Sequence, residues 1–232
     1  MAGWPQREQL QRRLGQLKNE RASWWAHWKE LSLYLSPRQG RFFVQDRNKG
    51  TRKHNAIYDN EATRSLQILA AGLQGGLTSP ARPWFRLSTG DENLQKNPNV
   101  KLWLDECTNT MLTVFQRSNT YRSLHAAYKE LGAFGTAAIL VMPDFDNVIH
   151  MHPLTIGEYA ISTDFKGKVC TLYREFELTV SQIVKEFGKD KCSTSVQNMF
   201  DNGTLDTWVT VVHCIEPRAD RDPSKVDNLN MA

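Results

Sequence analysis

The alternation of apolar and polar positions divides the chain into a helical first part and a strand-rich second part. From residue 7 to 35, large apolar residues recur at steps of three and four, with Arg21 in one of the slots and no proline before Pro37. This spacing predicts one long amphipathic helix. Such a helix either lies on its own domain or packs on a neighbouring subunit, with candidate contacts at Trp24, Trp28 and Leu31.

A second helix is predicted over residues 60–77, where four leucines step along one face: Leu66, Leu69, Leu73 and Leu77. The same segment holds Gly72, Gly75 and Gly76. Glycine in a helix is less favourable than alanine by up to about 1 kcal/mol, so three in five residues need a packing reason. We expect another backbone to approach closely here, which makes these glycines candidates for subunit packing. No phosphate-binding glycine pattern can be read in the segment.

Two prolines, at 80 and 83, end this helix, and the alternation of residues 84–87 predicts a short strand. A third helix is predicted over 98–116, with Trp103 and Met111 on its apolar side, and a fourth over 121–134.

Strand patterns dominate after Gly135. They predict strands at 136–142, 147–152, 158–163, 168–178 and 207–215, with a hairpin turn at 165–167. Thr179 and Gln182 have the spacing of a capping box that opens a short helix closed by Gly188, and another short helix is expected near 192–200. The predicted fold class is α+β: a long N-terminal helix and a helical bundle, followed by a mixed or antiparallel β region with short helices. We expect three parts, at residues 1–58, 59–135 and 136–232.

Composition places the chain among globular proteins. Of its 232 residues 40% are hydrophobic and 10% aromatic, which excludes disorder as the main state. The longest strongly apolar stretch, residues 136–142, is far shorter than the roughly 20 residues of a membrane span. The four cysteines show no paired spacing, so reduced thiols are expected.

The net charge of +4 is unevenly distributed, because residues 1–60 hold 12 Lys and Arg against five Asp and Glu. Part of this excess surrounds Phe42 and Phe43, and its members are Arg38, Arg41, Lys49, Arg52 and Lys53. Two interpretations remain open. The segment is a solvated connecting loop, or it contacts DNA or another partner. The second would make the protein a sequence-tolerant nucleic-acid-binding module whose affinity falls steeply with salt.

The sequence offers no arrangement for catalysis. It contains no GxSxG, HExxH, Walker or kinase motif. His150 and His152 could share one face of a strand, but no third metal ligand can be identified. We therefore predict no catalytic, metal or cofactor-binding residues, no cofactor and no enzymatic activity.

The run YDNEATRSLQILAAGLQGGLTSPARPWFRL at residues 58–87 resembles the portal (head-to-tail connector) proteins of short-tailed bacteriophages. Further segments agree with that family in order and spacing: WL at 103–104, LGAFGTAAI at 131–139, YREFELTVSQIVKEFG at 173–188 and VVHCIEPR at 211–218. The resemblance covers nearly the whole chain and implies the fold of the portal wing domain. Portal subunits are commonly more than twice this length, so we expect an N-terminal portion that stops before the stem and clip, without the segments that line the channel.

The resemblance also implies a function and partners. The intact protein is expected to form a homo-oligomeric ring, a dodecamer, at one vertex of the capsid. That ring would be the conduit for packaging and ejecting double-stranded DNA. It would dock the terminase packaging motor, the scaffold or capsid, and the tail proteins. The expected location is the virion, after assembly in the cytoplasm of the host bacterium, and no membrane partner is expected.

Overall fold

A computed structural model describes residues 4–37, 57 and 59–217 and divides them into two compact units. The sheet unit contains residues 4–26 and 157–217, and the helical unit contains residues 27–37, 57 and 59–156. The first helix, α1 (Trp4–Leu35), passes from one unit into the other after Ala26. The three-part division predicted at residues 58 and 135 stays a prediction.

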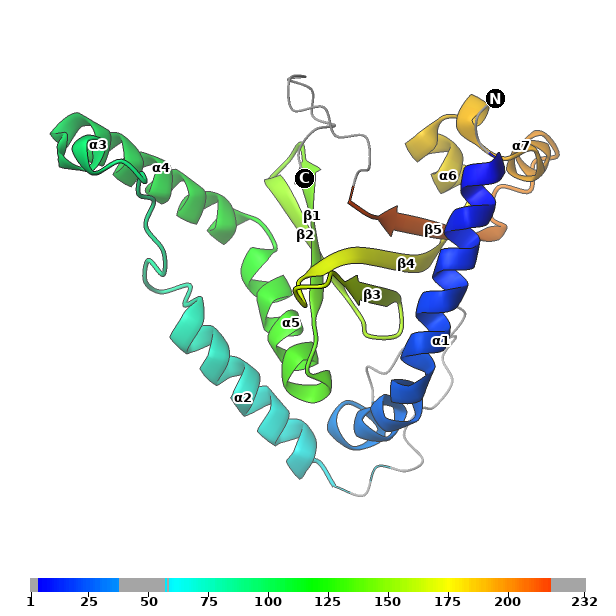
Figure 1. Ribbon diagram of the computed structural model, residues 1–232, viewed down its shortest axis with the longest axis horizontal. Coiled ribbons are helices and arrows are strands. Elements are labelled where there is room, and N and C mark those ends of the chain that lie inside the picture. The colour runs from blue at the N-terminus through cyan, green and yellow to red at the C-terminus, as the bar shows by residue number, and fades with distance from the viewer. Residues whose placement is uncertain (1–3, 38–56, 58, 218–232) are drawn as a thin grey trace. The chain divides into compact units, whose positions relative to one another are not determined.

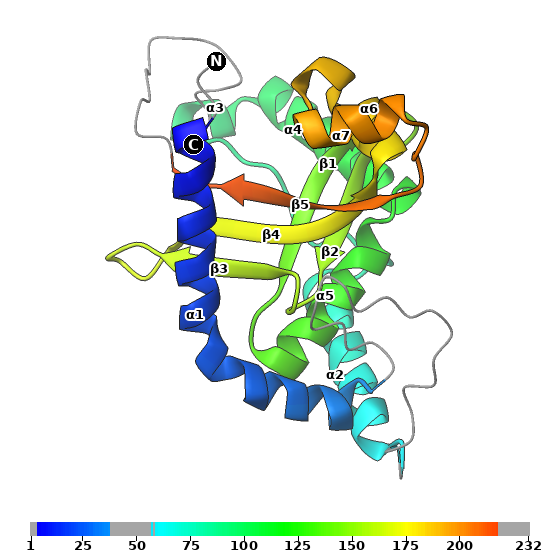
Figure 2. The ribbon, with the colours of Figure 1, turned by 90° about the vertical axis from the view of Figure 1, so that its right-hand side faces the viewer.

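The sheet unit is built on three antiparallel strands in the order β3-β4-β5. Their bounds are β3 (Tyr159–Thr163), β4 (Val169–Thr179) and β5 (Trp208–Ile215). The predicted turn between β3 and β4 is confirmed, and Gly167 there has a φ of +75°, which favours glycine. The first half of α1 lies across this sheet (Figure 2), where Leu14 and Leu17 pack against Ala160 and Tyr173.

The end of β4 runs directly into α6 (Val180–Phe187), which is followed by the short helix η1 (Lys189–Lys191) and by α7 (Thr194–Asp201). The predicted capping box is confirmed: the Thr179 hydroxyl accepts from the N–H of Gln182, and the Gln182 side chain accepts from the N–H of Thr179. Val180, Ile183 and Val196 form a small core under α6 and α7.

The helical unit is organised around α5 (Thr120–Phe134), which packs against α2 (Glu61–Leu77) on one side, as Figure 1 shows. A Cβ added at Gly132 of α5 would lie 3.1 Å from Leu69 Cδ2 and 3.2 Å from Leu66 Cδ1. The close approach of α5 to α2 therefore depends on the missing side chain at Gly132.

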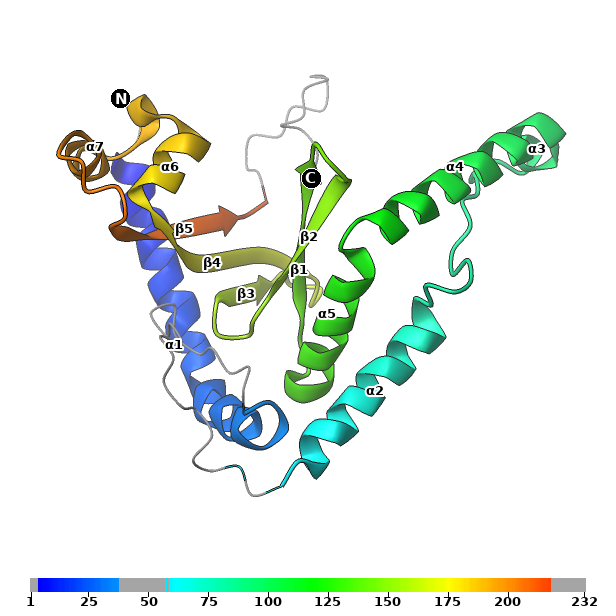
Figure 3. The same cartoon turned by 180° about the vertical axis from the view of Figure 1, so that it is seen from behind.

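A β-hairpin lies against α5 as well (Figure 3). Its strands, β1 (Ala138–Asp144) and β2 (Val148–Leu154), pair in antiparallel register. Asn119 holds the hairpin to the start of α5, because its side chain accepts from the N–H of Met151 at 2.8 Å and donates to the Met151 carbonyl at 2.7 Å. Ser123 also donates to that carbonyl, at 3.0 Å.

The α+β fold class and the order of the long elements are confirmed, and four local features differ from the predictions. Residues 84–87 form no strand, and a five-residue helix, α3 (Glu92–Lys96), was not predicted. In α4 (Pro98–Arg117) the central buried residue is Thr108, whereas Trp103 is 61% exposed. Two of the four leucines assigned to one face of the second helix, Leu69 and Leu77, are about half exposed. In the described part of the chain, no helix combines the length and the apolar character that a membrane span needs.

Candidate assembly surfaces

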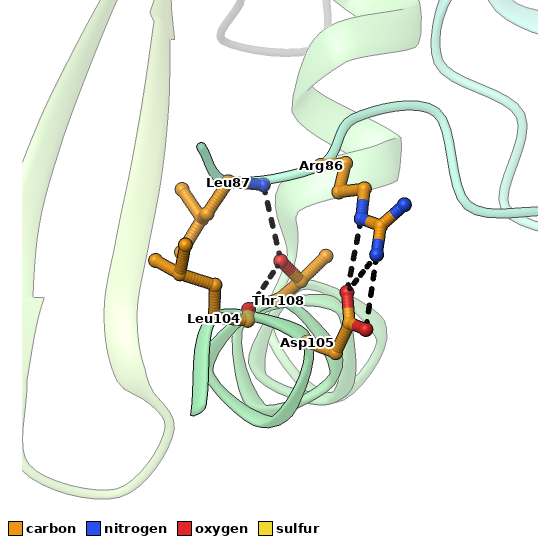
Figure 4. A network of polar contacts seen from close by, with 5 residues as sticks. All are labelled: Arg86, Leu87, Leu104, Asp105 and Thr108. Carbon is orange, nitrogen blue, oxygen red and sulfur yellow. Dashed lines mark hydrogen bonds and ion pairs between the residues drawn. The ribbon is translucent and has the colours of Figure 1, made fainter. Parts of the chain in front are cut away.

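A bracket of polar contacts fastens the segment after α2 to α4 (Figure 4). The Arg86 guanidinium donates from Nε and Nη2 to the two carboxylate oxygens of Asp105, each at 3.0 Å. The Thr108 hydroxyl accepts from the N–H of Leu87 at 3.2 Å and donates to the Leu104 carbonyl at 2.8 Å. The Leu87 N–H is therefore satisfied by a helix side chain and not by a neighbouring strand.

Aromatic packing reinforces the bracket. The rings of Trp84 and Phe85 lie 4.7 Å apart, and both contact Phe115 of α4, with centroids at 6.1 and 5.8 Å. The alternation that suggested a strand in the sequence thus serves a different purpose, because aromatic residues fill the space between the segment and α4.

The side of α2 that faces away from α5 carries an open apolar surface. Gly72, Gly75 and Gly76 have no atom within 4 Å of an added Cβ, so nothing in the described part of the chain packs against them. Ile68 beside them is 62% exposed. The only uncharged polar side chain within residues 68–77, Gln74, bonds to the Tyr121 carbonyl and to His125 in α5. We call this surface, residues 68, 72, 75 and 76, the open face of α2.

The candidate contacts on α1 belong to different units. Trp24 belongs to the sheet unit and is 58% exposed, while Trp28 and Leu31 belong to the helical unit and are partly buried. The neighbouring Arg21 is committed to the fold: its guanidinium lies over the Trp25 ring and donates to the Tyr159 carbonyl.

The basic candidates Arg38, Arg41, Lys49, Arg52 and Lys53 all lie outside the described residues, as do Phe42 and Phe43. The sequence-based alternatives for this segment therefore stay predictions.

The groups with displaced pKa values in the sheet unit have structural explanations. Burial, and then the hydrogen bond to Glu216, raise the pKa of Tyr173 well above its usual range. Burial also lowers the pKa of His213, and the adjacent Arg174 guanidinium, whose Nε donates to His213 Nδ1 at 3.3 Å, adds to the effect. Lys18 of α1 pairs with Glu175 at 2.6 Å. These contacts join α1, β4 and the β5 end of the chain rather than converge on a substrate.

No described part of the molecule assembles a catalytic or metal centre. Among the described residues no group of three or more His, Cys, Asp or Glu is placed to hold a metal ion. A hollow of about 550 Å³ beside the start of α2 is lined by Asp59, Arg64 and Lys129 among others. Its described lining brings together cations, one carboxylate and the hydroxyls of Ser36 and Thr63, and it contains neither His nor Cys.

Comparison with known proteins identifies the family. The pattern of the family described as bacteriophage head to tail connecting protein matches residues 7–232. The chain is 61% identical over 232 residues to a probable portal protein of Bordetella phage BPP-1. The aligned region covers all of this chain and 42% of that protein. It is 44% identical over 225 residues to the portal protein of Salmonella phage epsilon15, covering 97% of this chain and 40% of that protein.

The chain thus spans about two fifths of the length of these curated relatives. Neither relative's name supports the alternative of a nucleic-acid-binding module. Because the family pattern extends over nearly every residue, this chain belongs to the bacteriophage head to tail connecting protein family.

Proposed function

We propose that this chain is part of a structural portal subunit, which forms a ring at one vertex of a phage capsid. The ring is the conduit through which the genome is packaged and ejected, and it docks the packaging motor and the tail. The observation that carries the proposal is the family match over residues 7–232, together with two relatives named as portal proteins. In this proposal the subunit is part of the virion, and the closed ring is a dodecamer.

The role is mechanical, and ATP hydrolysis belongs to the partner motor. The titratable groups with displaced pKa values support this view, because Tyr173, Arg174 and His213 are explained by contacts within the sheet unit.

A closed ring of identical subunits requires two different, complementary surfaces on each copy. The open face of α2 is our candidate for part of one of them. It is apolar and uncharged on its exposed side, and its three glycines leave room for another backbone to approach. The exposed Trp24, with Trp28 and Leu31, is our candidate for part of another.

The glycines allow assembly to be separated from folding. In a helix with open space around it, Gly→Ala stabilises the fold by about 0.4–1 kcal/mol, because it restricts the unfolded chain. We therefore expect the full-length triple variant Gly72→Ala, Gly75→Ala, Gly76→Ala to resist urea better than wild type but to assemble poorly, since the new methyl groups occupy the space meant for a neighbour.

Sedimentation velocity on the wild type, the triple variant and a Gly15→Ala control tests this proposal. Gly15 is also inside a helix with no atom within 4 Å of an added Cβ, so its substitution should raise stability and leave the ring intact. Normal rings from the triple variant would remove the open face of α2 from the interface. Wild-type protein that sediments only as a monomer would contradict the portal function itself.

A further inference from the structure

Two hairpin tips expose a phenylalanine almost completely. Phe145 lies in the turn between β1 and β2 and is 108% exposed, and Phe165 lies in the turn between β3 and β4 and is 94% exposed. Each tip adds a valine that is more than half exposed, Val148 in the first and Val169 in the second. A phenylalanine has a large apolar area to bury, so two tips that each present one are candidates for contact surfaces.

The two tips carry opposite charge. The β1–β2 tip, residues 144–148, contains Asp144 and Asp146 and no cation, and we call it the acidic tip. The β3–β4 tip, residues 164–169, contains Lys166 and Lys168, and we call it the basic tip. Its single carboxylate, Asp164, accepts hydrogen bonds from the N–H groups of both lysines at 2.9 Å and keeps its charge, so two lysines against one aspartate leave this tip with a net charge of +1. Both lysines are exposed.

Matched apolar content and opposite charge are what two surfaces that meet each other require. Both tips belong to every copy of the chain, one to each compact unit. A ring with one kind of head-to-tail interface needs such a pair of different surfaces on each subunit. We infer that the acidic tip of one subunit docks against the basic tip of the next subunit in the ring, and this inference rests on the proposed portal function.

Reversing the charge of each tip separately tests the inference in full-length protein. Variant A carries Asp144→Asn and Asp146→Lys. The asparagine keeps an acceptor for the N–H of Asp146, which Asp144 provides at 3.3 Å, so the turn is preserved. Variant B carries Lys166→Glu and Lys168→Glu. Each variant alone brings like charges together at every interface, and we expect at least about tenfold weaker association at low salt, with recovery as salt rises.

Mixing the two variants gives the decisive result. In an A–B mixture every interface again joins opposite charges, so we expect alternating rings, which close only with an even number of subunits. The chain that carries all four substitutions should also form rings. The matched control is Glu186→Lys with Asp190→Lys, which reverses two exposed acidic residues that belong to neither tip and should assemble as wild type does.

Three outcomes would overturn the inference. Unchanged rings from A and B would show that the tips meet no neighbour. Rescue by the fourfold variant without rescue by mixing would place the contact within one chain. Defects in both variants with no rescue of either kind would assign the tips to another partner. If the wild type forms no ring at all, the proposed function fails first, and that failure is seen before any variant is compared.

Discussion

Val148 has a backbone conformation that its side chain disfavours. Its φ is +70°, in the left-handed region, where a β-branched residue is strained. The N–H of Ile149 bonds to the Asn147 carbonyl at 2.8 Å, so the strain lies in a tight three-residue turn at the end of the β1–β2 hairpin. Since Val148 is 62% exposed, its side chain gains little from burial in return.

We expect Val148→Gly to stabilise the protein by about 1 kcal/mol, because glycine adopts a positive φ without strain. The free energy of unfolding in urea measures this effect. Val169→Gly is the matched control: it is also an exposed valine in a hairpin, but its φ is outside the left-handed region, so glycine there should destabilise the protein. Two variants that are destabilised equally would show that residue 148 is unstrained.

At the scale of elements, Thr108 decides how the segment after α2 joins α4. It is 5% exposed, and its hydroxyl is the partner of the Leu87 N–H. Removing one partner of a buried hydrogen bond leaves the other without compensation for its lost hydration.

Thr108→Val, which keeps the shape, should therefore lower the free energy of unfolding by about 1–2 kcal/mol. Thr108→Ser should retain most of the stability. Thr110→Val on the same helix is the control, because that hydroxyl is exposed and bonds only to the Glu106 carbonyl of its own helix, so we expect a change within about 0.5 kcal/mol. Equal losses from Thr108→Val and Thr110→Val in urea unfolding would mean that the bracket does not hold the segment.

Elements with local signals could be predicted from the sequence. The capping box of α6 and the turn before β4 are defined by residues within a few positions of each other, Thr179 with Gln182 and residues 165–167. Residues 84–87 show the limit of such signals. Alternation indicates an extended chain, but a strand also needs a partner, and here the partner is the side chain of Thr108 in a helix.

The candidate surfaces also differ in whether a local sequence signal indicates them. The glycines of α2 are recognisable from the sequence, because glycine is unfavourable inside a helix and three of them occur within five residues. The exposed tips did not stand out, since periodicity cannot tell whether a phenylalanine between turn residues folds back or faces solvent. The signal that could have found them is a phenylalanine directly after an aspartate at the start of a turn, as in Asp144-Phe145 and Asp164-Phe165.

At the scale of the whole molecule, the two compact units each contribute surfaces that a ring can use. The helical unit carries the open face of α2 and the acidic tip, and the sheet unit carries the basic tip and Trp24. A single helix, α1, contributes residues to both units. Different surfaces on different units suit the head-to-tail contacts of a cyclic assembly.

Copies of this subunit are proposed to form a closed ring, and electron microscopy of the purified full-length protein tests for that ring most directly. Top views report rotational symmetry without any assumption about the interface. We predict rings with a central channel and twelvefold symmetry. Monomers at every concentration and salt tested, or open filaments without closure, would contradict the account.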